Sequence, residues 1–225
     1  MKKIGLIGAL PQEIAVLNKK LTNATETKNA LWTYHSGQMH NKEVVIVQCG
    51  VGKVNAAIVA QHLINNMGVT AIINSGVAGA VSKDLDIGDI VVSNEVFHHD
   101  VDVRAFGYKR GQIPQFKVIG FPADPTLINI AKTSTNTIIG RIATGDQFVT
   151  STNLQSITEI YPDTLCVEME GAAIAQVCYL YNIPFVIIRS ISDKADGGAA
   201  QDFSENLENS VAAYTGVVEK IIEEY

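Results

Sequence analysis

FVIIRSISD, residues 185–193, is the stretch that decides the fold, because an apolar run passes directly into polar and small residues and ends at an aspartate. The β-branched run from Phe185 to Ile188 is typical of a strand buried on both faces of a parallel sheet. In α/β proteins such strands point their carboxyl ends into a ligand crevice. Asp193 is therefore a candidate site residue, since a carboxylate is rarely buried unless it is paired or used.

A second acidic stretch, VEMEG at residues 167–171, has the same form. It follows an apolar segment, and it opens an apolar helix from Ala172 to Tyr181. Glu170 is thus expected at a strand-to-helix junction that also faces a ligand crevice.

Outward from these stretches, strands alternate with helices along the chain. Strands are expected at 4–7, 33–38, 43–49, 71–75, 89–97 and 138–144, and helices at 11–21, 50–66 and 125–133. A last helix carries an apolar stripe, and Asp202 and Glu205 are expected to form its capping pair. The segment 107–125 has little periodicity and is expected to be a long loop, and such loops in compact domains are usually functional or disordered. The alternation predicts an α/β fold, a three-layer α/β/α sandwich around a largely parallel sheet.

Composition narrows the function classes. The 225 residues are 47% hydrophobic and 18% charged, and no change of composition marks a boundary, so we expect one domain over residues 1–225. A net charge of −6 argues against a nucleic-acid partner, which requires a basic face. No apolar run reaches the roughly 20 residues that a membrane span requires.

The cysteines and the amino terminus indicate a cytoplasmic protein. Cys49, Cys166 and Cys178 lie in apolar segments without CxxC spacing, which is typical of buried reduced thiols. The apolar run at 4–10 imitates a secretory signal, but Pro11 follows it in place of a small-residue cleavage site. We therefore expect a buried first strand there.

Several short motifs fail as cofactor or metal sites. GVGK at 50–53 lacks the upstream glycine and the following Ser or Thr of a phosphate loop, and GLIG at 5–8 lacks the spacing of a dinucleotide fingerprint. HHDVD at 98–102 resembles a metal site, but neighbours on an extended segment point to opposite faces. We expect no cofactor and no metal.

Taken together, the segments resemble a known family, the 5′-methylthioadenosine/S-adenosylhomocysteine nucleosidases. The ordered set that carries the resemblance is IGLIGA at 4–9, GVGKV at 50–54, GDIVVS at 88–93, AFGY at 105–108, VEME at 167–170 and SISD at 190–193. The resemblance covers almost the whole chain. It implies a nucleoside phosphorylase-like fold with a mixed sheet, and hydrolysis of the N-glycosidic bond between adenine and a 5′-thio-substituted ribose.

The resemblance also implies roles for the acidic residues. Glu13 would activate the attacking water, and Asp193 would hold a proton at the purine N7, so that adenine leaves as a neutral molecule. Glu170 would accept hydrogen bonds from the ribose hydroxyls. This division between two carboxyl groups suits glycoside hydrolysis with inversion. Asp193 must be protonated when it acts, which requires a raised pKa.

Further contacts follow from the same resemblance. Phe148 would stack on adenine while the backbone of Val149 contacts its edge, and Met169 would pack on the sugar. Phe203 would cover the 5′-thio group, and Ser192 belongs to the SISD motif. In a homodimer, the loop bearing Phe106 and Pro114 would reach the partner subunit's site.

Simpler roles exist for the same residues. Glu13 is an ordinary first-turn helix residue favoured by the helix dipole, and Glu170 has the same alternative at the next helix. Asp193 suits a cap for the following turn. Arg189 is most simply an ion-pair partner for one of these acids, and is a secondary candidate for substrate binding.

Three departures from the family pattern stand out. Leu10-Pro11-Gln12 precedes Glu13 where the family commonly has Met-Glu-Glu, and Pro in a first helical turn is acceptable. Gly171 replaces a common Ala. Val77 stands where a Ser or Thr usually helps to hold the water, so either another group holds it or hydrolysis is slowed.

Two rival functions remain open from sequence. A purine nucleoside phosphorylase shares the fold, but residues 74–77 (NSGV) supply no cation to grip phosphate. A weakly catalytic nucleoside-binding protein is the other, and Val77 is the hint for it.

Overall fold

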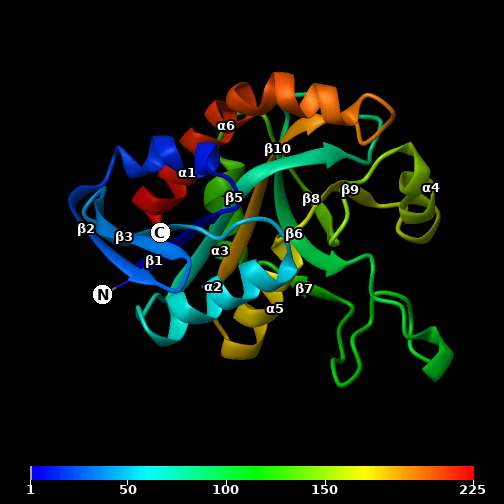
Figure 1. The fold of residues 1–225 in the computed structure, drawn as a ribbon, viewed down its shortest axis with the longest axis horizontal. Helices are drawn as coiled ribbons and strands as arrows, with labels where there is room; N and C mark the ends of the chain where they lie inside the picture. Colours follow the sequence, from blue (N-terminus) through cyan, green and yellow to red (C-terminus); the bar gives the residue numbers. More distant parts are fainter. Residues whose placement is uncertain (1) are drawn as a thin grey trace.

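The computed structural model describes residues 2–225, which form a ten-stranded mixed sheet with helices on both faces (Figure 1). The strands are β1 (Lys3–Gly8), β2 (Thr22–Asn29), β3 (Trp32–Met39), β4 (Lys42–Gln48), β5 (Ala71–Ala80), β6 (Ile90–His98), β7 (Gly120–Pro122), β8 (Thr137–Thr144), β9 (Thr164–Glu168) and β10 (Phe185–Asp193). The helices are α1 (Pro11–Asn18), α2 (Lys53–Asn65), α3 (Pro125–Lys132), α4 (Ser151–Ile160), α5 (Gly171–Tyr181) and α6 (Ala199–Glu224), with a 3₁₀ turn η1 at Arg104–Phe106.

The strand order is β10-β6-β8-β9-β5-β1-β4-β3-β2, with β7 beside β6. Strand β10 also pairs with β5, so part of the sheet closes on itself. Strand β5 runs parallel to both β1 and β10, with Gly76 opposite Arg189. Because parallel strands end at the same edge, the carboxyl ends of β1, β5 and β10 meet at one place.

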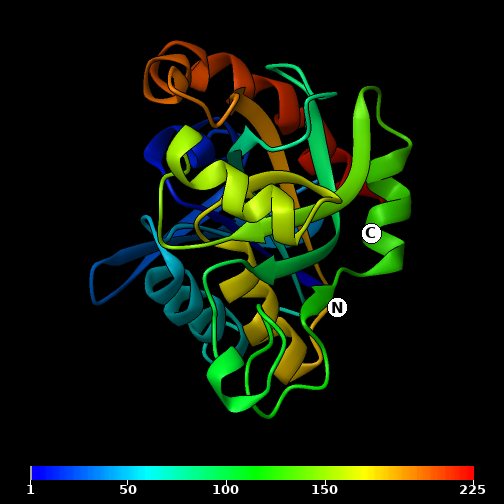
Figure 2. The same ribbon diagram turned by 90° about the vertical axis from the view of Figure 1, so that its right-hand side faces the viewer.

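Two helical layers cover the sheet and confirm the expected three-layer sandwich. Helices α2 and α5 pack on one face around Val59, Leu63 and Ile174, while α1, α3 and α6 pack on the other face. Figure 2, turned from the first view, shows α6 along one side of the sheet and α5 on the other. The apolar stripe of α6 is core packing, as expected, since Tyr214 and Ile221 are fully buried.

The first strand is buried as expected, with Ile4, Leu6 and Ile7 fully enclosed. The three cysteines are free and buried. Among the helices of residues 2–225, none combines the length and the apolar character that crossing a bilayer would require. The part of the segment 99–119 around η1 projects from the body of the molecule (Figure 1), while Ile113, Phe116 and Val118 pack against the core.

Several element boundaries differ from expectation. Helix α1 stops at Asn18, β5 continues beyond residue 75 to Ala80, and β2, α4 and β7, the last within the expected loop at 107–125, were not anticipated. The expected capping pair of the last helix is wrong, because α6 begins at Ala199 and Asp202 already lies inside its first turn. All residues of β2 are exposed, so it lacks the apolar periodicity from which strands are inferred, whereas α4 and the residue after it carry a short apolar stripe at Leu154, Ile157 and Tyr161.

Candidate active site

A cavity of about 200 Å³ opens where the carboxyl ends of β1, β5, β9 and β10 meet. Its walls are mostly apolar, with four carboxylates that come from three separate parts of the chain. The lining residues are Ala9, Leu10, Glu13, Val51, Val77, Ala78, Gly79, Gln147, Phe148, Val149, Val167, Glu168, Met169, Glu170, Ser192, Asp193 and Phe203. An apolar cavity with a few convergent polar groups is the usual form of a small-molecule site.

Glu13 lies in the first turn of α1 and is 3% exposed. Its Oε2 accepts hydrogen bonds from the amides of Ala9 (2.6 Å) and Leu10 (2.9 Å), and its Oε1 accepts one from the amide of Val77 (3.1 Å). The simpler role is thus fulfilled, because the carboxylate caps its own helix. However, the third bond joins it to β5, at the wall of the cavity.

The environment of Glu13 shifts its acidity. Burial raises the pKa of its carboxyl, while the nearby Arg189 guanidinium and the three amides oppose that rise. The Tyr214 hydroxyl donates to the Glu13 carbonyl oxygen at 3.1 Å and so ties α1 to α6. Glu13 is therefore a fixed carboxylate that is a stronger base than an exposed one.

Gly76 makes the position of Glu13 possible. A Cβ at this residue would lie 2.6 Å from the Glu13 Oε1, closer than van der Waals contact allows. The glycine thus lets the carboxylate rest directly against β5, beside the Val77 amide that it accepts from.

Asp193 ends β10 and is 2% exposed. Its Oδ1 accepts from the Ala195 amide (2.9 Å), and its Oδ2 accepts from the Ser192 hydroxyl (2.9 Å). Burial raises the pKa of this carboxyl, and the charges of Asp202 and Asp196 add to the rise, against the two hydrogen bonds. The expected turn cap is present in the Ala195 bond, and the same carboxyl faces the cavity with a raised pKa.

Glu170 occupies the residue before α5, yet it does not cap that helix. Its Oε1 instead accepts from the Gly52 amide at the start of α2 (2.8 Å). Burial and the charge of Glu168 raise the pKa of Glu170, while Arg189, whose Nη2 lies 4.0 Å from Oε2, lowers it. This side chain therefore points into the cavity with one carboxylate oxygen free of the bond to Gly52.

Glu168 caps α5 in place of Glu170. Its Oε2 accepts from the amides of Glu170 (3.0 Å) and Gly171 (2.6 Å) and pairs with the Arg189 guanidinium, and its Oε1 accepts from the Thr144 hydroxyl. All of these groups are buried. A buried acid with this many hydrogen-bond and ion-pair partners has a structural role.

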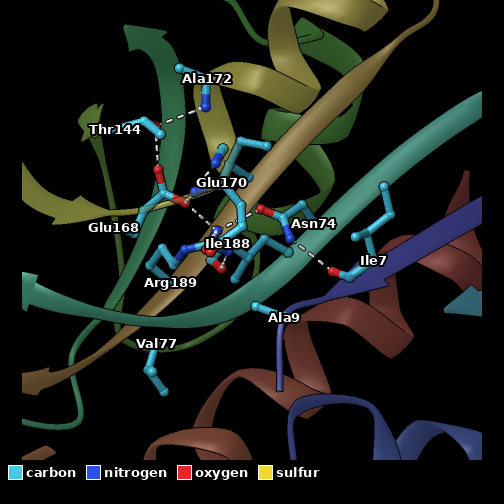
Figure 3. A network of polar contacts seen from close by, with 12 residues as sticks. Ile7, Ala9, Asn74, Val77, Thr144, Glu168, Glu170, Ala172, Ile188 and Arg189 are labelled. Carbon is cyan, nitrogen blue, oxygen red and sulfur yellow. Dashed lines mark hydrogen bonds and ion pairs between the residues drawn. The ribbon is translucent and has the colours of Figure 1, made fainter. Parts of the chain in front are cut away.

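The network continues across the sheet (Figure 3). Arg189 donates from Nη2 to the Asn74 Oδ1 at 2.6 Å, and the Asn74 Nδ2 donates to the Ile7 carbonyl at 2.8 Å. Figure 3 shows this chain of contacts running from β1 through β5 and β10 to the start of α5. The strands whose ends form the cavity are thereby locked together by buried polar contacts.

Aromatic and apolar side chains complete the cavity. Phe148 and Phe203 meet edge to face, with ring centroids 6.0 Å apart and an interplanar angle of 88°. Phe148 is 47% exposed, so its ring lies at the mouth. Val149 is buried and Met169 half-buried in the wall. The arrangement provides a flat apolar slot beside the carboxyl of Asp193.

The structure brings most of the expected site residues together. Glu13, Val77, Phe148, Val149, Met169, Glu170, Ser192, Asp193 and Phe203 all line the cavity. Arg189 does not line it, because its guanidinium lies behind the wall, paired with Glu168 as the simpler interpretation had it. Phe106 lies in the segment 99–119 and is 81% exposed, and Pro114 lies farther along the same segment. Neither residue lines this cavity.

Sequence reasoning missed the roles of Glu168, Asn74 and Thr144. Glu168 was visible only as the first acid of VEME, and its alternation with Glu170 was the available signal that the two carboxyls have different surroundings. Asn74 lies inside the largely apolar β5 and Thr144 is the last residue of β8, and a buried polar side chain at such a place is a sign of a hydrogen-bond network.

The chemistry available to this site is acid–base chemistry. A fixed basic carboxylate and a second carboxyl with a raised pKa line one small cavity, which is the arrangement used to split a glycosidic bond. In residues 2–225, no group of three or more His, Cys, Asp or Glu side chains is placed to hold a metal ion.

Comparisons with known proteins agree with this chemistry. The model of the Phosphorylase superfamily matches residues 3–223. A 5′-methylthioadenosine/S-adenosylhomocysteine nucleosidase of Staphylococcus saprophyticus is 44% identical over 225 residues, covering 97% of this chain and 98% of that protein.

Solved structures give the same result. The nucleosidase of that name from Neisseria meningitidis, in complex with methylthio-immucillin-A, has a TM-score of 0.97 and 38% identity and covers 100% of both chains. The one from Colwellia psychrerythraea, in complex with adenine, has a TM-score of 0.95 and 40% identity and covers 98% of this chain and 94% of that one.

Proposed function

Since the chain belongs to the phosphorylase superfamily, among its 5′-methylthioadenosine/S-adenosylhomocysteine nucleosidases, we propose that it hydrolyses the N-glycosidic bond of these two nucleosides. It is an N-glycosyl hydrolase that releases adenine and the 5′-thioribose. The small-molecule partners are thus 5′-thioadenosine nucleosides.

One observation carries the proposal: Glu13, Glu170 and Asp193, far apart in sequence, line one cavity of about 200 Å³. Two of them have the properties that hydrolysis needs. The raised pKa of Asp193 favours its protonated form, which is the form that can protonate a leaving purine. Glu13 is held by three amides as an acceptor for a proton of water.

The reaction begins with adenine between Phe148 and the Val149 backbone and with the Asp193 proton at N7. As the C1′–N9 bond breaks, its electron pair moves into the purine, which leaves neutral because N7 has been protonated. Water attacks C1′ from the other face of the sugar and gives its proton to Glu13. Glu170 accepts hydrogen bonds from the ribose hydroxyls, Met169 packs on the sugar, and Phe203 covers the 5′-thio group.

Ser192 supports the acid rather than the substrate. Its hydroxyl donates to the Asp193 Oδ2 and lies 3.3 Å from the Ala78 carbonyl, so it orients the carboxyl. Arg189 acts through the carboxylates behind the wall: its charge opposes the desolvation of Glu13 and keeps Glu168 paired.

Val77 is poorly suited to hold the attacking water. Its amide already serves Glu13, and its side chain has no hydroxyl with which to hold the water. The water is therefore held chiefly by Glu13. This is the observation that would favour a weakly catalytic nucleoside-binding protein.

A phosphorylase is disfavoured by the same region. Residues 74–77 lie in β5 with no cation among them, and the nearby guanidinium of Arg189 is already bonded to Asn74 and Glu168. Phosphate recognition normally needs charge-assisted donors that are available to the anion.

The direct test is chromatography of the products from 5′-methylthioadenosine, with and without phosphate. Free adenine and methylthioribose in both conditions are expected. A ribosyl phosphate that forms only with phosphate would select the phosphorylase, and tight binding without product would select the non-catalytic protein.

The homodimer is a further part of the proposal. Val54 and Ile58 are exposed apolar side chains on α2, Val51 is exposed just before that helix, and Phe106 is 81% exposed on the segment 99–119. Apolar side chains gathered in this way are typical of an interface between proteins. The segment that carries Phe106 and Pro114 reaches the partner subunit's cavity and completes its 5′ end.

Subunit mixing tests this arrangement. Phe106→Ala and Asp193→Asn homodimers are each expected to hydrolyse the substrate slowly. The first lacks the phenyl ring that the other subunit contributes to each cavity, and the second lacks the acid. A mixed dimer holds one cavity with an intact Asp193 and an intact Phe106 from the partner, so mixing should restore activity. A monomer by sedimentation, or no gain on mixing, would contradict the shared site.

A cytoplasmic location is also proposed. The three cysteines are reduced and buried, which is the usual state of thiols in that compartment. Fractionation of cells that express a tagged chain would test it.

A further inference from the structure

A second polar cluster lies beside the cavity and outside its lining. The Lys53 ammonium contacts both carboxylate oxygens of Asp100, at 2.8 Å and 2.7 Å. The two side chains are only 20% and 19% exposed. This ion pair joins the start of α2 to the residues that follow β6.

Asp146 closes the cluster into a ring. Its backbone amide donates to the Asp100 Oδ2 at 3.1 Å, and its own Oδ1 accepts from the Lys53 amide at 2.8 Å. The bonds therefore run from the Lys53 side chain to Asp100, on to the Asp146 backbone, and back from the Asp146 side chain to the Lys53 backbone. Three segments that are remote in sequence are held at one point.

The Lys53–Asp100–Asp146 ring consists of three residues with ionisable side chains that are joined by hydrogen bonds. Partial burial raises the pKa of Asp100, but the bonds from Lys53 and from the Asp146 amide outweigh it and leave that pKa below its ordinary value. These bonds thus stabilise the ionised form of the Asp100 carboxyl. Gly52 has a φ of 100°, and a Cβ there would lie 3.2 Å from the Asp146 Oδ1, so glycine leaves room for this carboxylate.

The ring touches the cavity on two sides. On one side, the residue before Lys53 is Gly52, whose amide donates to the Glu170 Oε1 at 2.8 Å. On the other side, Asp146 directly precedes Gln147, Phe148 and Val149, which line the cavity. Both groups that hold the nucleoside, the ribose carboxylate and the purine loop, are therefore anchored to the same ion pair.

We propose that Lys53, through Asp100 and Asp146, is the positioning residue that sets the distance between the purine loop and the ribose carboxylate Glu170, and so determines nucleoside affinity rather than bond cleavage. The inference rests on the proposed function, because it assigns the two anchored groups to the two ends of a nucleoside. Asp100 also begins the segment that bears Phe106, so the same pair fixes the base of the loop offered to the partner subunit.

We expect the ring to affect nucleoside affinity and not bond cleavage, because it makes no hydrogen bond to the residues that transfer protons. Glu13 and Asp193, which carry out the proton transfers, have none of their hydrogen bonds in the ring. Loss of an interaction made equally in the ground state and the transition state raises KM and leaves kcat unchanged. A salt bridge with a structural role alone would lower stability without this pattern.

The test compares Lys53→Met with Arg141→Met in steady-state hydrolysis of 5′-methylthioadenosine. Lys53→Met should raise KM about tenfold while kcat stays within about twofold. Arg141 is the matched control, because it is 21% exposed, forms ion pairs with Glu95 and Asp163, and lies outside both the ring and the cavity. Arg141→Met should lower the melting temperature and leave KM unchanged.

Two further variants sharpen the result. Lys53→Arg keeps the charge and the bonds to Asp100, so it should restore most of the affinity. Lys53→Met combined with Asp146→Ala should raise KM no further than the larger single effect, because both changes open the same ring. Additive effects would overturn the inference.

Failure of the positioning role can be distinguished from failure of the proposed function. Active wild-type enzyme with an unchanged KM in Lys53→Met, or with a loss confined to kcat, would overturn the positioning role alone. Wild-type enzyme that releases no adenine would contradict the proposed function first.

Discussion

At the scale of single residues, the site depends on carboxyl groups whose surroundings differ. Asp193 and Glu13 are both buried and both have raised pKa values, but Glu13 accepts three amide bonds and Asp193 only one. Amide donors stabilise the ionised form of a carboxyl. Three amides and the Arg189 guanidinium therefore oppose the rise in the pKa of Glu13, whereas the charges of Asp202 and Asp196 add to the rise at Asp193, against one amide and the Ser192 hydroxyl.

Asp193→Asn tests the acid. The amide preserves the shape of the side chain but cannot release a proton to N7, so turnover should fall by about 10²–10⁴-fold. The dissociation constant for 5′-methylthioadenosine, measured by calorimetry, should change little. Turnover close to that of the wild type would remove Asp193 from the mechanism.

Val77→Ser tests the water site. A hydroxyl at this place in the cavity wall adds one hydrogen-bond partner for the attacking water, so the single-turnover rate should rise about two- to tenfold. Val77→Ala is the control, since it makes the same room without a hydroxyl. An unchanged rate in Val77→Ser would mean that another group already holds the water.

At the scale of elements, the strand ends are joined by the Arg189 network. Arg189 on β10 holds Asn74 on β5 and Glu168 at the end of β9, and Glu168 in turn caps α5. The network explains why a cavity can open at these strand ends without loosening the sheet.

Arg189→Met should leave Glu168 as a buried charge without its cation. We expect the free energy of unfolding, measured with urea, to fall by about 3–5 kcal/mol. Arg189→Met combined with Glu168→Gln should recover part of that loss, because the uncompensated charge is gone. A loss below about 1 kcal/mol in the single variant would show that the pair contributes little.

Element prediction succeeded where burial imposes a pattern. The apolar runs of β1 and β10 and the stripe of α6 were visible because their side chains pack on other elements. Strand β2 lies at the sheet edge with every residue exposed, so its sequence carries no comparable pattern, and the apolar stripe of α4 at Leu154 and Ile157 is short. The predicted strand ends at Ser75, five residues before the end of β5, because the last residues of β5 are mostly glycine and small side chains.

At the scale of the whole molecule, folding buries several ionisable side chains in the site, and burial of a charged group costs free energy. Glu13, Glu168 and Glu170 are buried around one buried guanidinium, that of Arg189. Burial and the charge of Glu168 raise the pKa of Glu170 above its ordinary value of 4.5. Folding therefore favours the neutral form of Glu170, and ionisation of this residue costs stability.

The pH dependence of stability should follow from this shift. The contribution of Glu170 is fully present below its unfolded pKa and is lost as the pH rises through its folded pKa. Glu170→Gln removes that loss, so the variant should gain stability relative to the wild type between about pH 5 and about pH 8. Denaturant unfolding of both proteins at the two pH values measures the difference, and a constant difference would contradict the assignment.

The sequence by itself determined the α/β class, the order of the buried elements and, through ordered motifs, the family. These features follow from local chemistry: apolar periodicity marks what is buried, and strand ends are where polar residues follow apolar ones. Only the tertiary structure decided that Glu168 is the structural acid and Glu170 the free one, that Arg189 lies behind the cavity, and that Lys53 joins the two sides of the site. Neighbouring carboxylates look alike along a chain, and they become different only when folding brings different remote donors to each, the guanidinium of Arg189 into direct contact with Glu168 and the amide of Gly52 to Glu170.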